Sequence, residues 1–187
     1  VIDACIAVMD TPDIDLDGIM QYINGPAFPT GGTVMGEAGI REAYSTGRGK
    51  MQMRSRTEIE SLRGGKQQIV ITEIPYQVVK ARLVTAMENI RLEKKVEGIA
   101  EVRDESGREG MRIVVELKKE ADANGILAYL LKKTDLQVSY NFNMVAIVNK
   151  APQQLGVKAI LEAYINHQRE VITKRTSHEL EKAKDRS

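Results

Sequence analysis

Strand-like and helix-like runs alternate between residues 67 and 149, and their order limits the folds open to this chain. Alternating β-branched and apolar residues predict four strands, over 67–74, 99–103, 112–118 and 137–148. Apolar residues at helical spacing predict two helices, over 78–94 and 125–133. The order β-α-β-β-α-β is that of a ferredoxin-like core, whose helices lie on one face of a mostly antiparallel sheet. The sequence therefore predicts an α+β fold.

Helical patterns flank this core on both sides. The first fifty residues read as two helices, separated by a turn at 11–13, and a Gly/Pro-rich connector. After Pro152 an apolar stripe predicts one long helix with a highly charged tail. We expect three parts: an N-terminal helical and connector segment (1–50), a sheet domain (51–152) and the start of a long coiled-coil helix (153–187). Val1 lies within an apolar helical pattern, so we expect a piece of a longer protein.

Composition excludes several classes of protein. The formal net charge is +1, so any contact with DNA must come from local basic patches. The single cysteine, Cys5, allows no disulfide within the chain, which fits a reducing compartment. No apolar run approaches the roughly 20 residues that span a bilayer, and no secretory signal is visible. We therefore expect a cytoplasmic chain without a membrane partner.

A predicted strand that ends at Pro75 is followed by a helical pattern carrying Lys80 and Arg82. Side-chain cations beside a helix N-terminus suit phosphate binding, because backbone N–H groups converge there. Arg91 lies three turns after Lys80 on the same flank of the helix. The alternative is a solvated helix edge. The residues alone do not decide between these two interpretations, but this helix is the best candidate for contact with DNA.

Two further basic pairs are candidates for phosphate contact. Arg54 and Arg56 are two residues apart, which places them on one face of a predicted strand. Arg48 and Lys50 lie in a flexible Gly-Arg-Gly-Lys segment. Surface ion pairs and a simple loop are the competing interpretations.

No metal or nucleotide site is expected in this chain. Asp13, Asp15 and Asp17 resemble the start of a calcium-binding loop, but Asn24 stands where a bidentate Glu is needed, so helix capping is favoured. The Gly-Arg-Gly-Lys segment lacks the remaining residues of a phosphate-binding loop. His167 and His178 have no metal-binding neighbours at suitable spacing.

Several blocks carry a family resemblance. They read GPAFPT (25–30), GIREAY (39–44), TGRG (46–49), IPYQVVKARL (74–83) and GIAEVRDES (98–106), followed by GMR (110–112). Together they resemble the A subunit of bacterial type IIA topoisomerases, which comprise DNA gyrase and topoisomerase IV. Ala27 stands where the family has Asp, and Val79 where many members have Asn.

The resemblance implies a tower region that supports the bent gate DNA and leads into a coiled coil. In the family a tyrosine that follows an arginine attacks the DNA phosphate. None of the six tyrosines here follows an arginine, so we expect the catalytic tyrosine upstream of Val1 and an inactive isolated fragment. The implied partners are double-stranded DNA, the B subunit (ParE or GyrB) and a second A subunit. The implied cofactors, Mg²⁺ and ATP, act through the B subunit.

Residues 135–144 (DLQVSYNFNM) are more similar to topoisomerase IV than to gyrase, whose members read QTSFGINM there. We therefore favour topoisomerase IV, with gyrase A as the alternative. A more distant alternative is a ferredoxin-like ligand-sensing or interaction module, because a fold alone does not fix function.

Overall fold

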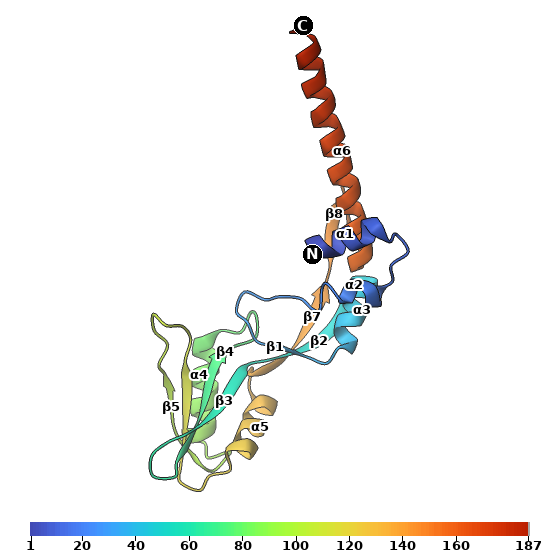
Figure 1. The fold of residues 1–187 in the computed structure, drawn as a ribbon. Coiled ribbons are helices and arrows are strands. Elements are labelled where there is room, and N and C mark those ends of the chain that lie inside the picture. The colour runs from blue at the N-terminus through green and yellow to red at the C-terminus, as the bar shows by residue number, and fades with distance from the viewer. Residues whose placement is uncertain (187) are drawn as a thin grey trace. The chain divides into compact units, whose positions relative to one another are not determined.

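The computed structural model describes residues 1–186, and Figure 1 traces the chain through them. Its contacts group the chain into two compact units: Ala27–Gly36 with Met51–Tyr140, and the segments before, between and after these. The elements, in chain order, are α1 (Ile2–Asp10), α2 (Leu16–Met20), β1 (Thr33–Met35), α3 (Ala38–Thr46), β2 (Arg48–Arg54), β3 (Arg56–Ser61), β4 (Gln67–Glu73), α4 (Lys80–Leu92), β5 (Ile99–Asp104), β6 (Ile113–Leu117), α5 (Ala123–Lys133), β7 (Gln137–Asn143), β8 (Val145–Val148), β9 (Ala151–Gln154) and α6 (Val157–Lys184). The predicted α+β class, with N-terminal helices and a long C-terminal helix, is confirmed.

A four-stranded antiparallel sheet of order β3-β4-β6-β5 forms the centre of the sheet unit. Its apolar face is continuous because the register aligns Ile69 with Val115 and Ile71 with Ile113. Helices α4 and α5 both pack on this face, through residues that include Leu83 on α4. This cluster is the hydrophobic core of the unit.

The predicted closing strand of the ferredoxin-like core is not in this sheet. Strand β7 instead joins β1 and β2 in a three-stranded sheet, and β3 takes the place beside β4. The short turn after β3, in which the Leu62 N–H donates to the Lys66 carbonyl (2.8 Å), makes this pairing local. A local hairpin closes a much shorter loop than pairing with residues near 140 would, so its entropic cost is smaller.

Two predicted strands are each divided in two. The strand predicted to carry Arg54 and Arg56 breaks at Ser55, whose N–H donates to the Leu136 carbonyl at 2.8 Å. The strand predicted over 137–148 breaks at Met144, whose N–H donates to the Gly47 carbonyl at 2.7 Å. In both places the backbone bonds to a loop or helix end instead of continuing a ladder.

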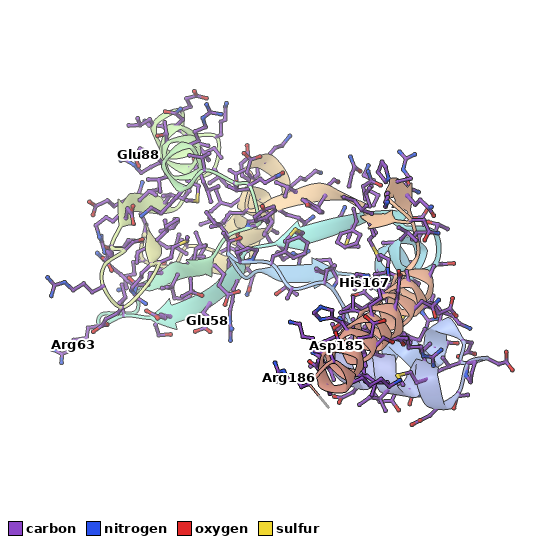
Figure 2. The ribbon with its side chains drawn as sticks, turned by 90° about the horizontal axis from the view of Figure 1, so that it is seen from above. Glu58, Arg63, Glu88, His167, Asp185 and Arg186 are labelled. Atoms are coloured by element: carbon purple, nitrogen blue, oxygen red, sulfur yellow. The ribbon has the colours of Figure 1, made fainter. Side chains whose placement is uncertain are left out.

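The second face of the four-stranded sheet is polar. Glu58 on β3 and Glu88 on α4 lie on opposite sides of the unit in Figure 2. Val70 and Val114 are fully buried in the middle of the polar face. Ion pairs of Arg103 and Arg112 surround them, with partners Glu60, Glu101, Glu105 and Glu116. Long charged side chains therefore cover this face without a helix.

The other unit is built around the N-terminal part of α6. Helix α1 packs there through Ala4 and Val8, against a side of α6 that buries Leu161 and Ile165. From Arg169 onward α6 is exposed, and Figure 1 shows this long helix running beyond its packing partners. Between residues 1 and 186, no helix is long and apolar enough to cross a membrane. The boundaries 1–50, 51–152 and 153–187 stay a prediction.

Candidate nucleic-acid interface

A tight turn connects β4 to α4. The Val78 N–H donates to the Pro75 carbonyl (3.1 Å), and Gln77 has a φ of 69°. A left-handed residue at this position is typical of a type II turn. Because the turn occupies the residues that follow Pro75, α4 begins at Lys80, two residues later than predicted.

The N-terminus of α4 has no side-chain cap. Its capping residue, Val79, offers no acceptor, and the first turn contains no acidic residue. The first helical hydrogen bond runs from the Leu83 N–H to the Val79 carbonyl. The N–H groups of Lys80, Ala81 and Arg82 precede it, so they have no partner within the helix. Such N–H groups favour an anion.

A groove of about 270 Å³ opens beside this helix end. Its lining carries two exposed charged residues, Arg82 and Asp135. The remaining lining residues are polar or apolar: Tyr76, Gln77, Val78, Val79, Val138, Ser139 and Tyr140. The groove therefore places one exposed guanidinium next to the uncapped helix N-terminus.

Three aromatic rings hold the turn in place. The ring of Phe28 lies 5.8 Å from that of Tyr76 and 5.2 Å from that of Tyr140, and the two tyrosine rings lie 6.2 Å apart. Tilted and edge-to-face contacts of this kind stabilise beyond simple area burial. They tie the turn to β7 and to the segment before β1. Sequence reasoning missed this cluster because its members are far apart along the chain.

Lys80 is paired with an acidic side chain. Its Nζ lies 2.8 Å from Oδ2 of Asp104, the last residue of β5, and both side chains are about a third exposed (37% and 35%). The hydrogen bond from Lys80, with others from Ser106, lowers the pKa of Asp104 to about 2. The Lys80 cation is therefore accessible but already has an anionic partner.

The other two predicted contacts on α4 differ from each other. Arg82 is exposed, and no ion pair within residues 1–186 involves it. Arg91 donates from Nε to Glu88 Oε2 (2.9 Å), and this hydrogen bond raises the pKa of Arg91. Arg82 is therefore the freest cation of the three, while the charge of Arg91 is largely neutralised.

The prediction that Arg54 and Arg56 share one face of a strand is wrong. Arg54 ends β2 opposite Thr33, and its Nε donates to the Gln137 side chain at 2.7 Å. Arg56 begins β3, and its Nη1 lies 3.5 Å from Oε1 of Glu73. The break at Ser55 assigns the two arginines to different sheets.

Arg48 and Lys50 are exposed on the first half of β2, within the unit that contains α6. The glycines beside them have structural reasons. Gly47 ends α3 with a φ of 83°, and a Cβ on Gly49 would lie 2.5 Å from the Gly39 carbonyl oxygen. Contact with DNA by the seven basic residues of α4, β2 and β3 described above stays a prediction.

One of the three aspartates, Asp15, caps helix α2, in line with the capping interpretation. Asp15 accepts the Gly18 N–H at 2.8 Å, and Asp17 pairs with Arg41. Between residues 1 and 186, no three His, Cys, Asp or Glu side chains gather as metal ligands would. These residues therefore form no site that fits Mg²⁺.

Comparison with known proteins relates every part of the chain to one family. The family model for the A subunit of DNA gyrase/topoisomerase IV matches residues 1–187. Over 186 residues the chain is 58% identical to the A subunit of DNA topoisomerase 4 from Bacillus subtilis (strain 168). It is 54% identical to the same protein from Streptococcus pyogenes serotype M3 (strain ATCC BAA-595 / MGAS315), and 51% identical to that from Staphylococcus epidermidis (strain ATCC 12228 / FDA PCI 1200).

Each of these alignments covers 100% of the chain and 23% of the relative. The chain thus spans about a quarter of the length of these curated relatives. The resemblance seen in the sequence blocks is confirmed. Because the family model matches every residue, the chain belongs to the family of DNA gyrase and topoisomerase IV A subunits.

Proposed function

We propose that this chain is the tower region of a topoisomerase IV A subunit, where it supports the arms of the bent gate duplex. The observation that carries the proposal is the uncapped N-terminus of α4, with Arg82 exposed in the adjacent groove and Lys80 beside it. Backbone N–H groups and two side-chain cations at one helix end are suited to a phosphate of the DNA backbone.

Such contacts position DNA without reading its sequence. Bending a duplex of 20–30 base pairs costs on the order of 1–6 kcal/mol, and phosphate contacts along the arms offset this cost. A rigid contact surface serves that role best. The aromatic cluster of Phe28, Tyr76 and Tyr140, which fixes the turn before α4, supports the proposal for this reason.

The parent enzyme, by this proposal, performs ATP-dependent passage of one duplex through another in the bacterial cytoplasm. The catalytic tyrosine belongs to the A subunit upstream of Val1, and Mg²⁺ and ATP act through the B subunit. The assembly contains two A subunits. The relatives named topoisomerase 4 support topoisomerase IV over gyrase A, which remains the alternative.

The test is a DNA titration of the complete A subunit at several salt concentrations. We expect the double variant Lys80→Ala/Arg82→Ala to weaken binding to every duplex sequence alike. The slope of log K against log salt should become shallower by about two, since each lost phosphate contact contributes about one.

Lys118→Ala/Lys119→Ala is the matched control. It removes the same charge from two exposed residues at the opposite end of the same sheet. That end carries the β3–β4 hairpin, whose Arg63 projects outward in Figure 2. If the two double variants changed the salt slope equally, the α4 end would not be a specific phosphate contact.

A further inference from the structure

We propose that Asp104 is an internal competitor for the DNA phosphate at Lys80. Its carboxylate holds the ammonium group of Lys80 at the start of α4 until a phosphate oxygen replaces it. The inference rests on the proposed function, because it requires that Lys80 contacts DNA. It adds a residue that has no direct contact with DNA but sets the strength of the contact.

The Asp104 carboxylate is fixed by the turn that follows β5. Its Oδ1 accepts the Ser106 N–H at 3.0 Å, while Oδ2 faces Lys80 Nζ at 2.8 Å. The turn is itself closed, since Ser106 Oγ accepts the Arg112 N–H (3.1 Å) and the Glu105 N–H donates to the Arg112 carbonyl (2.8 Å). The acidic partner is therefore rigid, whereas the lysine chain is long and rotatable.

Lys80 can exchange this partner for a phosphate with little rearrangement. The ion pair is about a third exposed on both sides, so solvent screens it and its strength is modest. A carboxylate and a phosphate oxygen make the same charge-assisted hydrogen bond to an ammonium group. A phosphate bound at the first turn of α4 would also accept hydrogen bonds from the uncapped N–H groups and from Arg82. Of these cationic and N–H groups, Asp104 contacts only Lys80, whereas a phosphate would contact several of them. The exchange is therefore favoured when DNA is present.

Asp104 also adds a negative charge close to the proposed DNA path. Both effects oppose binding, so neutralising Asp104 should tighten it. Asp104→Asn is the informative change because the amide oxygen still accepts the Ser106 N–H. Asp104→Ser, which also retains an oxygen, is the second variant and keeps the test open if the first variant unfolds.

The test is a double-mutant cycle in the complete A subunit, with equilibrium binding to one duplex followed by fluorescence anisotropy. Its members are the wild type, Asp104→Asn, Lys80→Met and the double variant. We expect Asp104→Asn to lower Kd about three- to fivefold, the upper part of the range of an exposed ion pair. In the Lys80→Met background the same substitution should change Kd by much less.

Glu97→Gln is the charge control, because Glu97 is exposed and removing its charge leaves Lys80 untouched. Equal tightening by Asp104→Asn and Glu97→Gln, or equal tightening with and without Lys80, would overturn the competitor role. The competitor role would also be overturned if Asp104→Asn left Kd unchanged while Lys80→Met weakened binding. If Lys80→Met binds as tightly as the wild type, the Lys80 contact of the proposed function itself fails. The two failures are therefore distinguishable.

Discussion

The ion pair between Lys80 and Asp104 connects the stability of the fold with the proposed DNA contact. Hydrogen bonds from Lys80 and Ser106 stabilise the charged form of Asp104 and lower its pKa from 3.8 to about 2. The pair stabilises the fold slightly, while the same carboxylate opposes the proposed phosphate contact. By this proposal, the contribution of Asp104 to stability and its effect on DNA binding have opposite signs.

The lowered pKa gives a pH-dependent prediction. A carboxyl group with a lowered folded-state pKa stabilises the fold at pH values above its unfolded-state pKa, and this contribution is lost as pH falls towards 2. Asp104→Asn should therefore lower the free energy of unfolding at pH 7 by at most about 1 kcal/mol, since solvent screens the pair. Urea unfolding of both proteins at pH 7 and pH 2.5 measures this difference. A difference that stays constant between the two pH values would contradict the account.

Individual residues also mark the limit of what the sequence could predict here. Arg82 and Lys80 could be found because they follow a strand that stops at a proline. Asp104 could not be assigned to Lys80 from the sequence. It is the last residue of β5, and only the packing of β5 beside α4 brings it close to Lys80. The left-handed conformation of Gln77 also has no local signal, since Gly or Asn is the usual residue at such a position.

At the scale of elements, local patterns located most strands and helices of the central sheet, but they did not give the strand pairing, and they missed β1, α3 and β9. Alternation identified β4 and β6, whereas nothing in β7 says that it pairs with β2 instead of β4. The break at Ser55 was invisible because a serine between two arginines fits an exposed strand equally well. Tertiary hydrogen bonds, such as that from Ser55 to Leu136, decided these points.

A glycine pair tests how elements pack at the end of α3. Gly47 and Gly64 have nearly the same φ, 83° and 82°. A Cβ on Gly47 would lie 2.7 Å from the Leu155 carbonyl oxygen, whereas a Cβ on Gly64 would have no atom within 4 Å. Gly64→Ala should cost only the left-handed conformation, about 1–2 kcal/mol. Gly47→Ala should lower the free energy of unfolding by clearly more, because the backbone of Leu155 must move to make room for the Cβ. Equal melting temperatures for the two variants would show that the close approach is unimportant.

At the scale of the whole molecule, the family could be identified from its sequence blocks, because they extend over the entire chain. The composition would not have suggested DNA binding, since the net charge is only +1. In the structure several cations, Arg91 and Arg103 among them, pair with neighbouring carboxylates, so the net charge alone does not say which cations are available for phosphate. The aromatic cluster behind the groove needed the folded chain to be seen.

The proposed division of labour predicts that this chain alone has no strand-cutting activity. Incubated with supercoiled plasmid and Mg²⁺, it should neither relax the DNA nor form a protein–DNA adduct that survives detergent. The expected reason is that the tyrosine nucleophile lies elsewhere in the complete protein. The assembled A and B subunits serve as the positive control in the same gel assay. Relaxation by the isolated chain would contradict the proposal.

Phosphate ethylation interference on the complete A and B assembly is the most direct measurement of the central claim. Ethylation removes the charge of one phosphate at a time, so it reports which phosphates the protein needs. We predict interference on both arms of the gate duplex, at symmetric positions that disappear in the Lys80→Ala/Arg82→Ala variant and persist in Lys118→Ala/Lys119→Ala. An interference pattern that is identical in all three proteins would contradict the claim that the α4 end holds the DNA backbone.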